Sequence, residues 1–123
     1  MRVLLSIKPE FADRIFNGEK QYEFRRVIFK NKNVTKVVVY ASAPISMVIG
    51  EFDIEYVIEA KPHDLWEQTK IFAGITKKYF LEYFQGLENA YAIKIKNFVR
   101  YSVPCDLESK FGVKPPQSFI YLS

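Results

Sequence analysis

The chain has 123 residues, 49% hydrophobic and 16% aromatic, and a net charge of +4, which suits one core, so we expect a single domain over residues 1–123. No apolar run approaches the roughly 20 residues of a membrane span, and Val3–Ile7 is too short for a signal peptide, so a membrane partner is excluded and a cytoplasmic protein is expected. One cysteine, Cys105, and one histidine, His63, exclude an internal disulfide and a zinc site built by the chain alone, so we expect no metal and no cofactor.

The first segment predicts a strand followed by a short helix. Residues Arg2–Ile7 have an apolar strand pattern, and Pro9 suits the first turn of a helix. Phe11 and Ile15 would belong to the buried face of this helix, which Asn17–Gly18 would end.

A charge-dense strand pattern, Lys20–Arg26, comes next. In a strand, Gln21, Glu23 and Arg25 share one face, and the two aromatic residues between them point to the other. A carboxylate acceptor beside a planar guanidinium can hold a polar, planar ligand such as a nucleobase or a phosphodiester. The alternative is a solvated outer face with a surface pair between Glu23 and Arg25.

The segment after this strand is basic. No acidic residue lies between Phe24 and Gly50, a stretch that carries Arg25, Arg26, Lys30, Lys32 and Lys36. Such a local concentration attracts phosphate groups, which makes nucleic acid the leading partner class. The alternative is a charged loop that serves only solubility.

The remaining elements are predicted from periodicity and turn residues. Strand patterns cover Lys36–Ala41, Met47–Glu59 and Ala90–Tyr101. One helix is expected to start at His63–Asp64, with Asp64 and Glu67 at the spacing of a capping box, and another to span Thr76–Phe84. The aromatic stripe of the latter, with Phe80, Tyr83 and Phe84, is typical of a core.

The order of these elements predicts the fold class. About six strands and two or three helices, without regular βαβ alternation, favour an α+β domain whose twisted sheet curls into a small barrel. The tail Lys114–Leu122 is expected to pack against the domain.

Several motifs, in chain order, resemble those of the ASCH domain family. They are Ser6-Ile7-Lys8-Pro9, Gly18-x-Lys20-x-x-Glu23-x-Arg25, Tyr40-Ala41-Ser42-Ala43-Pro44, Val48-Ile49-Gly50-Glu51-Phe52 and Pro115-Pro116-Gln117-Ser118-Phe119. The resemblance covers essentially the whole chain, and the Gly-x-Lys-x-x-x-x-Arg element is its most specific part. It implies a PUA-like mixed β pseudo-barrel with two to three flanking helices. It also implies a cleft beside this element that binds RNA, a nucleotide or a modified nucleoside.

Residue chemistry and the resemblance together define a candidate ligand site. Glu23 would accept from a base edge, Arg25 would contact phosphate, and Tyr40 would stack on a base. The complete set of candidate binding residues is Lys8, Lys20, Glu23, Arg25, Arg26, Tyr40, Ser42, Gln117 and Ser118. The structural alternatives are that Lys8 only flanks the first helix, Tyr40 is core, and Gln117 and Ser118 only satisfy backbone groups of the docked tail.

Two enzymatic readings follow from the resemblance. One branch of the family hydrolyses an acylated cytidine nucleoside with a lysine, a threonine and a carboxylate. Lys20 matches the lysine, but Glu23 stands at the threonine position. Phe72–Ile75, where the carboxylate would fall, contains no acidic residue. Some ASCH proteins are ribonucleases, and Lys20, Glu23 and Arg25 are candidate catalytic residues for such a metal-independent hydrolase. Lys20 and Glu23 have opposite strand parity, so they converge only if Lys20 belongs to the turn.

Two further hypotheses therefore stand beside RNA or nucleotide binding, which leads. One is the hydrolase, and the other is a regulatory, protein-interaction domain with an exposed aromatic patch that includes Phe72, Tyr79 and Tyr83. The sequence indicates no oligomeric state.

Overall fold

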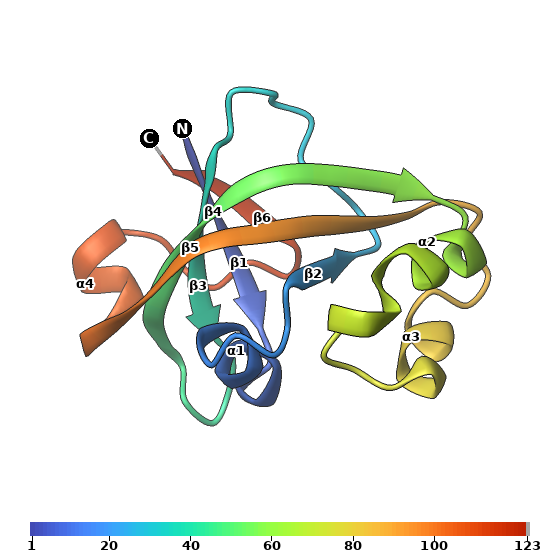
Figure 1. Cartoon of the computed structure of the whole chain (residues 1–123). Helices are drawn as coiled ribbons and strands as arrows, with labels where there is room; N and C mark the ends of the chain where they lie inside the picture. The colour runs from blue at the N-terminus through green and yellow to red at the C-terminus, as the bar shows by residue number, and fades with distance from the viewer. Residues whose placement is uncertain (123) are drawn as a thin grey trace.

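The computed structural model describes residues 1–122, which form one mixed sheet with helices at its faces and ends (Figure 1). The strands are β1 (Arg2–Ile7), β2 (Tyr22–Arg25), β3 (Lys36–Ala41), β4 (Met47–Ala60), β5 (Ala90–Cys105) and β6 (Phe119–Leu122). The helices are α1 (Pro9–Phe16), α2 (Pro62–Thr69), the 3-10 turn η1 (Lys70–Phe72), α3 (Lys77–Tyr83) and α4 (Leu107–Phe111).

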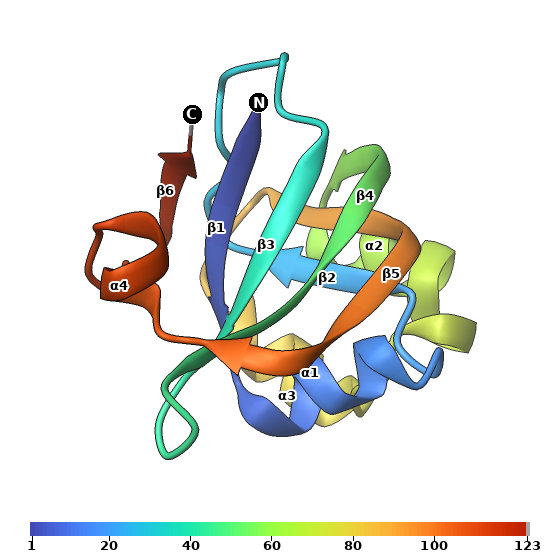
Figure 2. The same ribbon diagram turned by 90° about the vertical axis from the view of Figure 1, so that its left-hand side faces the viewer.

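The sheet has six strands in the order β2-β5-β4-β3-β1-β6. β1 and β3 pair in parallel, and every other neighbouring pair is antiparallel. The long strands β4 and β5 sweep across the sheet, and their shared register shifts at several points, where bulges add twist and bend the strands. Figure 2 shows the resulting curl. The predicted α+β fold with a curled mixed sheet is confirmed.

The strands β1 and β3 are buried on both faces, as their continuous apolar runs require. Alternate residues of β3, including Val37 and Val39, enter the main core between the sheet and α1. The intervening residues Val38 and Tyr40 enter a second cluster, with Leu107 of α4. This alternation decides which side chains of β3 can reach which face of the molecule.

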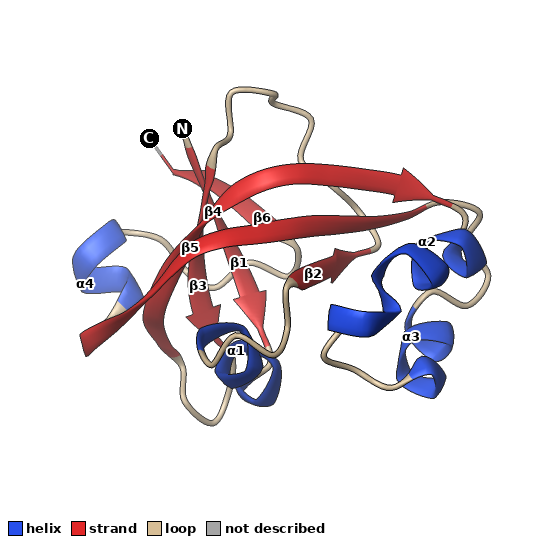
Figure 3. Ribbon diagram, viewed as in Figure 1, coloured by secondary structure: helices blue, strands red, loops and turns tan. Residues whose placement is uncertain are grey.

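A third core cluster joins α2 and α3 to the sheet end formed by β2 and β5 (Figure 3). Its centre is aromatic: the ring of Phe80 lies 5.1 Å from those of Phe24 and Trp66 and 4.8 Å from that of Phe84, between ring centroids. The predicted core role of Phe80 and Phe84 is thus confirmed, and so is the inward direction of the aromatic residues of β2.

Some element boundaries differ from the prediction. Helix α2 begins at Pro62 after Lys61, which has no capping side-chain hydrogen bond, and Glu67 pairs with Lys70 at 2.5 Å instead of closing a capping box. β5 continues to Cys105, and the short helix α4 was not predicted. Within residues 1–122, no helix has both the length and the apolar character of a membrane span.

Candidate functional site

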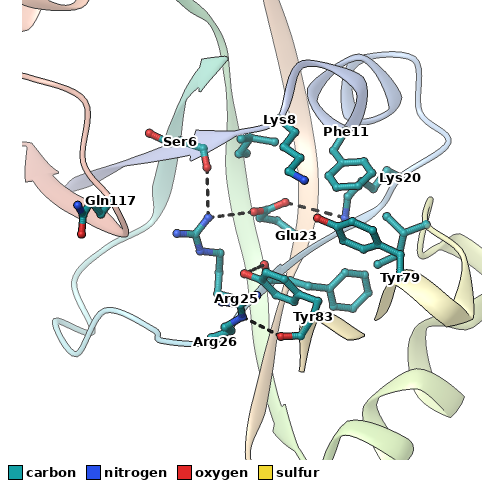
Figure 4. A pocket seen from close by; sticks show the side chains of 13 residues that line it. Ser6, Lys8, Phe11, Lys20, Glu23, Arg25, Arg26, Tyr79, Tyr83 and Gln117 are labelled. Carbon is teal, nitrogen blue, oxygen red and sulfur yellow. Dashed lines mark hydrogen bonds and ion pairs between the residues drawn. The ribbon is translucent and has the colours of Figure 1, made fainter. Parts of the chain in front are cut away.

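A cavity of about 250 Å³ opens where β1 runs into α1, beside β2 and α3 (Figure 4). The charge-dense strand β2 provides its polar floor through Glu23 and Arg25. One wall is aromatic and comes from α1 and α3, and Gln117 of the C-terminal tail lies at the other side. We call this cavity the candidate pocket.

The turn after α1 places Lys20 in the candidate pocket. Gly18 has a φ of +86°, and the backbone N–H of Lys20 then donates to the carbonyl of Arg14 at 2.9 Å. Lys20 therefore precedes the strand, which removes the parity conflict with Glu23. Gly74 lies against the Lys20 side chain so closely that a Cβ on Gly74 would meet Lys20 Cβ at 2.5 Å. Only glycine allows this approach.

Lys20 is a buried cation. Lys20 is only 2% exposed. Its Nζ donates to the carbonyl of Tyr22 and lies 3.9 Å from Glu23 Oε1. The same atom lies 4.6 Å from the centroid of the Phe24 ring. Burial lowers the pKa of Lys20 from its ordinary 10.5 to about 8. The negative charge of Glu23 raises this pKa in part, and the positive charge of Arg14 lowers it slightly further. Such a lysine releases its proton much more readily than a surface lysine does.

Glu23 and Arg25 form the second half of the polar floor. Glu23 is 6% exposed, and its Oε2 lies 3.3 Å from Arg25 Nη1. The same guanidinium donates to the carbonyl of Ser6 at 3.4 Å and to that of Ser118 at 2.8 Å. Arg25 thus holds β2, β1 and the C-terminal tail together around the carboxylate, and Ser6 Oγ adds a hydrogen bond to the Pro116 carbonyl at 3.0 Å.

The aromatic wall consists of Phe11, Tyr79 and Tyr83. The rings of Tyr79 and Tyr83 are stacked at 6.2 Å, and Phe11 meets Tyr79 edge-on at 5.1 Å, between centroids. Two cations flank this wall, with Lys8 Nζ 5.3 Å from the Tyr79 ring and Arg26 Cζ 4.3 Å from the Tyr83 ring. Stacked tyrosines beside cations are suited to a planar ring attached to an anion.

Two contacts fix the wall in place. Thr76 caps α3 by accepting from the N–H of Tyr79 at 3.1 Å. The Tyr83 hydroxyl donates to the carbonyl of Phe24 at 3.3 Å, and burial raises the pKa of this hydroxyl. The hydroxyl therefore stays protonated at neutral pH and can keep donating this bond.

Most of the predicted binding residues do meet in the candidate pocket: Lys8, Lys20, Glu23, Arg25, Arg26 and Gln117. Ser118 contributes its backbone carbonyl, which accepts from Arg25.

Neither Tyr40 nor Ser42 lines the candidate pocket, which corrects their predicted position. Tyr40 is 7% exposed and packs with Val38 in the cluster near α4, because its strand parity turns it away from the side of β3 that Val39 occupies. It is not available there to stack on a base in the pocket. The N–H of Ser42 donates to the carbonyl of Ile7 at 3.0 Å at the start of the β3–β4 turn.

The aromatic wall was not predicted as part of the ligand site: Tyr83 was assigned to the aromatic core stripe of its helix, and Tyr79 and Tyr83 to an exposed patch for a protein partner. The sequence feature that could have indicated the wall is the hydroxyl group of each tyrosine, which favours a position at the edge of the core over full burial. On α3, Phe80 and Phe84 share one face and enter the core, whereas Tyr79 and Tyr83 share the next face and border the cavity.

The arrangement combines a small planar-ring site with a buried cation–carboxylate pair. A volume of about 250 Å³ is below the roughly 300–1,000 Å³ of sites for drug-sized ligands, and matches one nucleobase or nucleoside. Within residues 1–122, no three His, Cys, Asp or Glu side chains are grouped so that they could hold a metal ion.

A family model, a sequence relative and a solved structure all point to the same family for this chain. The family model described as "ASCH domain" matches residues 5–99. A Zymomonas mobilis protein named "ASCH domain-containing ribonuclease" is 30% identical over 123 residues, covering 97% of this chain and 82% of that protein. The crystal structure of ASCH from Zymomonas mobilis superposes with a TM-score of 0.90 at 28% identity, covering 99% of this chain and 87% of that chain.

A second kind of relative is longer. The large ribosomal subunit protein uL22 of Ureaplasma parvum is 32% identical over 121 residues, which is 98% of this chain. The present chain spans only 39% of the length of that protein.

Proposed function

This chain belongs to the ASCH domain family, and we propose that it is a ribonuclease that takes one unstacked nucleotide of single-stranded RNA into the candidate pocket. The observation that carries the proposal is the buried pair of Lys20 and Glu23 at the floor of a pocket with an aromatic wall. A strongly perturbed ionisable group in a cleft is a physical indication of chemistry. The ribonuclease name of the Zymomonas relative supports the same reaction class.

The proposed reaction is an internal transesterification. The 2′-oxygen attacks the adjacent phosphorus, the bond from phosphorus to the 5′-oxygen breaks, and the products are a 2′,3′-cyclic phosphate and a 5′-hydroxyl end. Glu23 accepts the proton of the 2′-hydroxyl, and Lys20 donates a proton to the leaving 5′-oxygen. A lysine with a pKa of about 8 is a better acid for this step than one at 10.5.

The other residues bind and position. The base stacks on Tyr79 and Tyr83, and Lys8 and Arg26 offer positive charge to the phosphates. Arg25 supports the negative charge that develops on the phosphorane and fixes the Glu23 carboxylate, although its contacts with Ser6 and Ser118 already occupy part of its donor set.

The test is single-turnover cleavage of a labelled single-stranded RNA by Glu23→Gln. We expect cleavage to fall by about 10²-fold or more, the usual contribution of a general base, with RNA affinity retained. Glu55→Gln is the matched control, since Glu55 is exposed on β4 and away from the pocket. Unchanged cleavage by Glu23→Gln would eliminate Glu23 as the base.

Recognition of RNA without cleavage is the second candidate, and the aromatic wall favours it because stacking binds a base whether or not chemistry follows. RNA that binds in a salt-dependent manner and is recovered uncut would select this candidate.

A further inference from the structure

A second cavity, of about 550 Å³, is lined in part by the segment that follows β2. Arg26 lines the candidate pocket, while Phe29 and Lys30 of the same connection line this second cavity. In the view of Figure 1 the connection passes behind β4 on its way to β3. We call the second cavity the groove; its relevant residues are Phe29, Lys30, Lys32, Val57, Glu59 and Tyr91.

The groove and the candidate pocket share one face of the sheet. Tyr91 of β5 is the register partner of Arg25 of β2 and of Glu59 of β4. Cross-strand partners project to the same face, with Cα atoms roughly 4.5–5.5 Å apart. Tyr91 in the groove is therefore next to Arg25 in the pocket, on the same face of the sheet.

The rim of the groove is basic and held in place. Lys30 and Lys32 are exposed, and neither occurs in the ion pairs found among residues 1–122. The Tyr121 hydroxyl accepts from the backbone N–H groups of Lys30 and Asn31 at 3.0 and 3.1 Å. These bonds anchor the backbone of the loop at Lys30 and Asn31, and the exposed side chains of Lys30 and Lys32 add positive charge at this edge.

The floor of the groove is apolar and aromatic. Phe29 and Tyr91 are half-buried, and Val57 is 39% exposed. Glu59 is the one acidic residue of the lining, and it lies beside Tyr91 on the sheet. A base on this floor would find rings to stack on and a carboxylate for its exocyclic amino group, while its phosphate would face the lysines.

We propose that the groove is a second nucleotide subsite, which takes the nucleotide next to the one in the candidate pocket. The proposal rests on the proposed RNA function of that pocket. The RNA strand crosses the Arg26–Phe29 segment, with phosphates near Arg26, Lys30 and Lys32 and successive bases on the two aromatic surfaces. The exposed basic residues of the connection between β2 and β3, Arg26, Lys30 and Lys32, then serve as the phosphate track.

The test compares calorimetric binding of 2′-O-methyl oligoadenylates of one, two and four nucleotides, which lack the nucleophile for cleavage. Affinity should rise at least about fivefold from one to two nucleotides, since a stacked base contributes about 1 kcal/mol or more. Tyr91→Leu should remove this gain while leaving mononucleotide affinity unchanged, and Tyr91→Phe, which keeps the ring, should preserve it.

The phosphate track is tested by salt dependence. For the four-nucleotide probe, Lys30→Gln combined with Lys32→Gln should lower the slope of log affinity against log salt by about 1.4, at about 0.7 per phosphate contact on a single strand. The control is Lys96→Gln combined with Lys110→Gln, an equal loss of charge at exposed lysines outside the groove, which should leave the slope unchanged.

The outcomes separate the two proposals. If the mononucleotide binds and longer probes bind no better, the subsite is refuted and the pocket function stands. Equal losses in the groove variant and the control would also refute the subsite, because only net charge would then matter. A change of oligomeric state in Tyr91→Leu without any length effect would instead assign the groove to contacts between copies. If no probe binds at all, both proposals fail.

Discussion

Replacement of Lys20 by methionine should change the pH dependence of stability in a calculable way. The pKa of Lys20 falls from 10.5 to about 8 in the folded protein because of burial. At about 1.36 kcal/mol per pKa unit, the folded state at low pH carries a cost of about 3 kcal/mol for charged Lys20. Between pH 8 and 10.5 the unfolded chain holds the proton that the folded chain has released, so stability due to Lys20 rises with pH in this window.

The assay is urea unfolding of the parent protein and Lys20→Met at pH 7 and pH 10. Other groups titrate in both proteins and cancel in the difference of their unfolding free energies. The unfolding free energy of the parent should rise relative to that of Lys20→Met by about 2 to 3 kcal/mol between the two pH values. For Lys96→Met, a substitution at an exposed lysine, the same difference should change by less than about 0.5 kcal/mol. A difference that stays constant for Lys20→Met would refute the argument that Lys20 is destabilised by burial.

Three further predictions follow from the site. Gly74→Ala should destabilise the protein by more than the roughly 1–2 kcal/mol that an alanine costs in the left-handed conformation, because its Cβ would meet Lys20 Cβ at 2.5 Å. The same change should reduce RNA cleavage. Gly86→Ala is also at positive φ but has nothing within 4 Å, so chemical unfolding should show only the backbone cost. Arg25→Ala should cost about 3 kcal/mol, since it breaks the shorter of the two ion pairs of buried Glu23 and leaves the carbonyls of Ser6 and Ser118 without this donor. Arg100→Ala, which breaks an exposed pair with Asp13, should cost less than about 1 kcal/mol; equal values in urea unfolding would contradict the structural role of Arg25. The cleavage rate should decline as pH rises through about 8, because the pKa of Lys20 lies there and its protonated form is the acid; a rate that is flat to pH 9.5 in a pH profile would exclude that role.

Elements with a strong local pattern were predicted to the residue. The bounds of β1 and β3 agree because both are apolar runs buried on two faces. Helix α4 escaped prediction because five residues are too few to show a helical period, although Asp106 accepts from the N–H of Ser109 at 2.8 Å and Gly112 ends the helix at a φ of +69°.

The candidate site likewise has a part that the sequence predicted and a part that it did not. Glu23 and Arg25 share one face of β2 by their spacing, whereas Lys20 joins them because the turn at Gly18 holds it outside the strand. The aromatic wall depends on how α3 is rotated against β2, which side-chain periodicity does not determine. Tyr40 was placed in the cleft from its motif, yet the packing of β3 between two cores turns it to the other side.

The most direct test of the central claim is a crystal structure of the protein with an uncleavable 2′-O-methyl dinucleotide. We predict one base against Tyr79 and Tyr83 and the bridging phosphate beside Lys20 and Glu23. RNA bound elsewhere, with the candidate pocket open but without a nucleotide, would contradict the account.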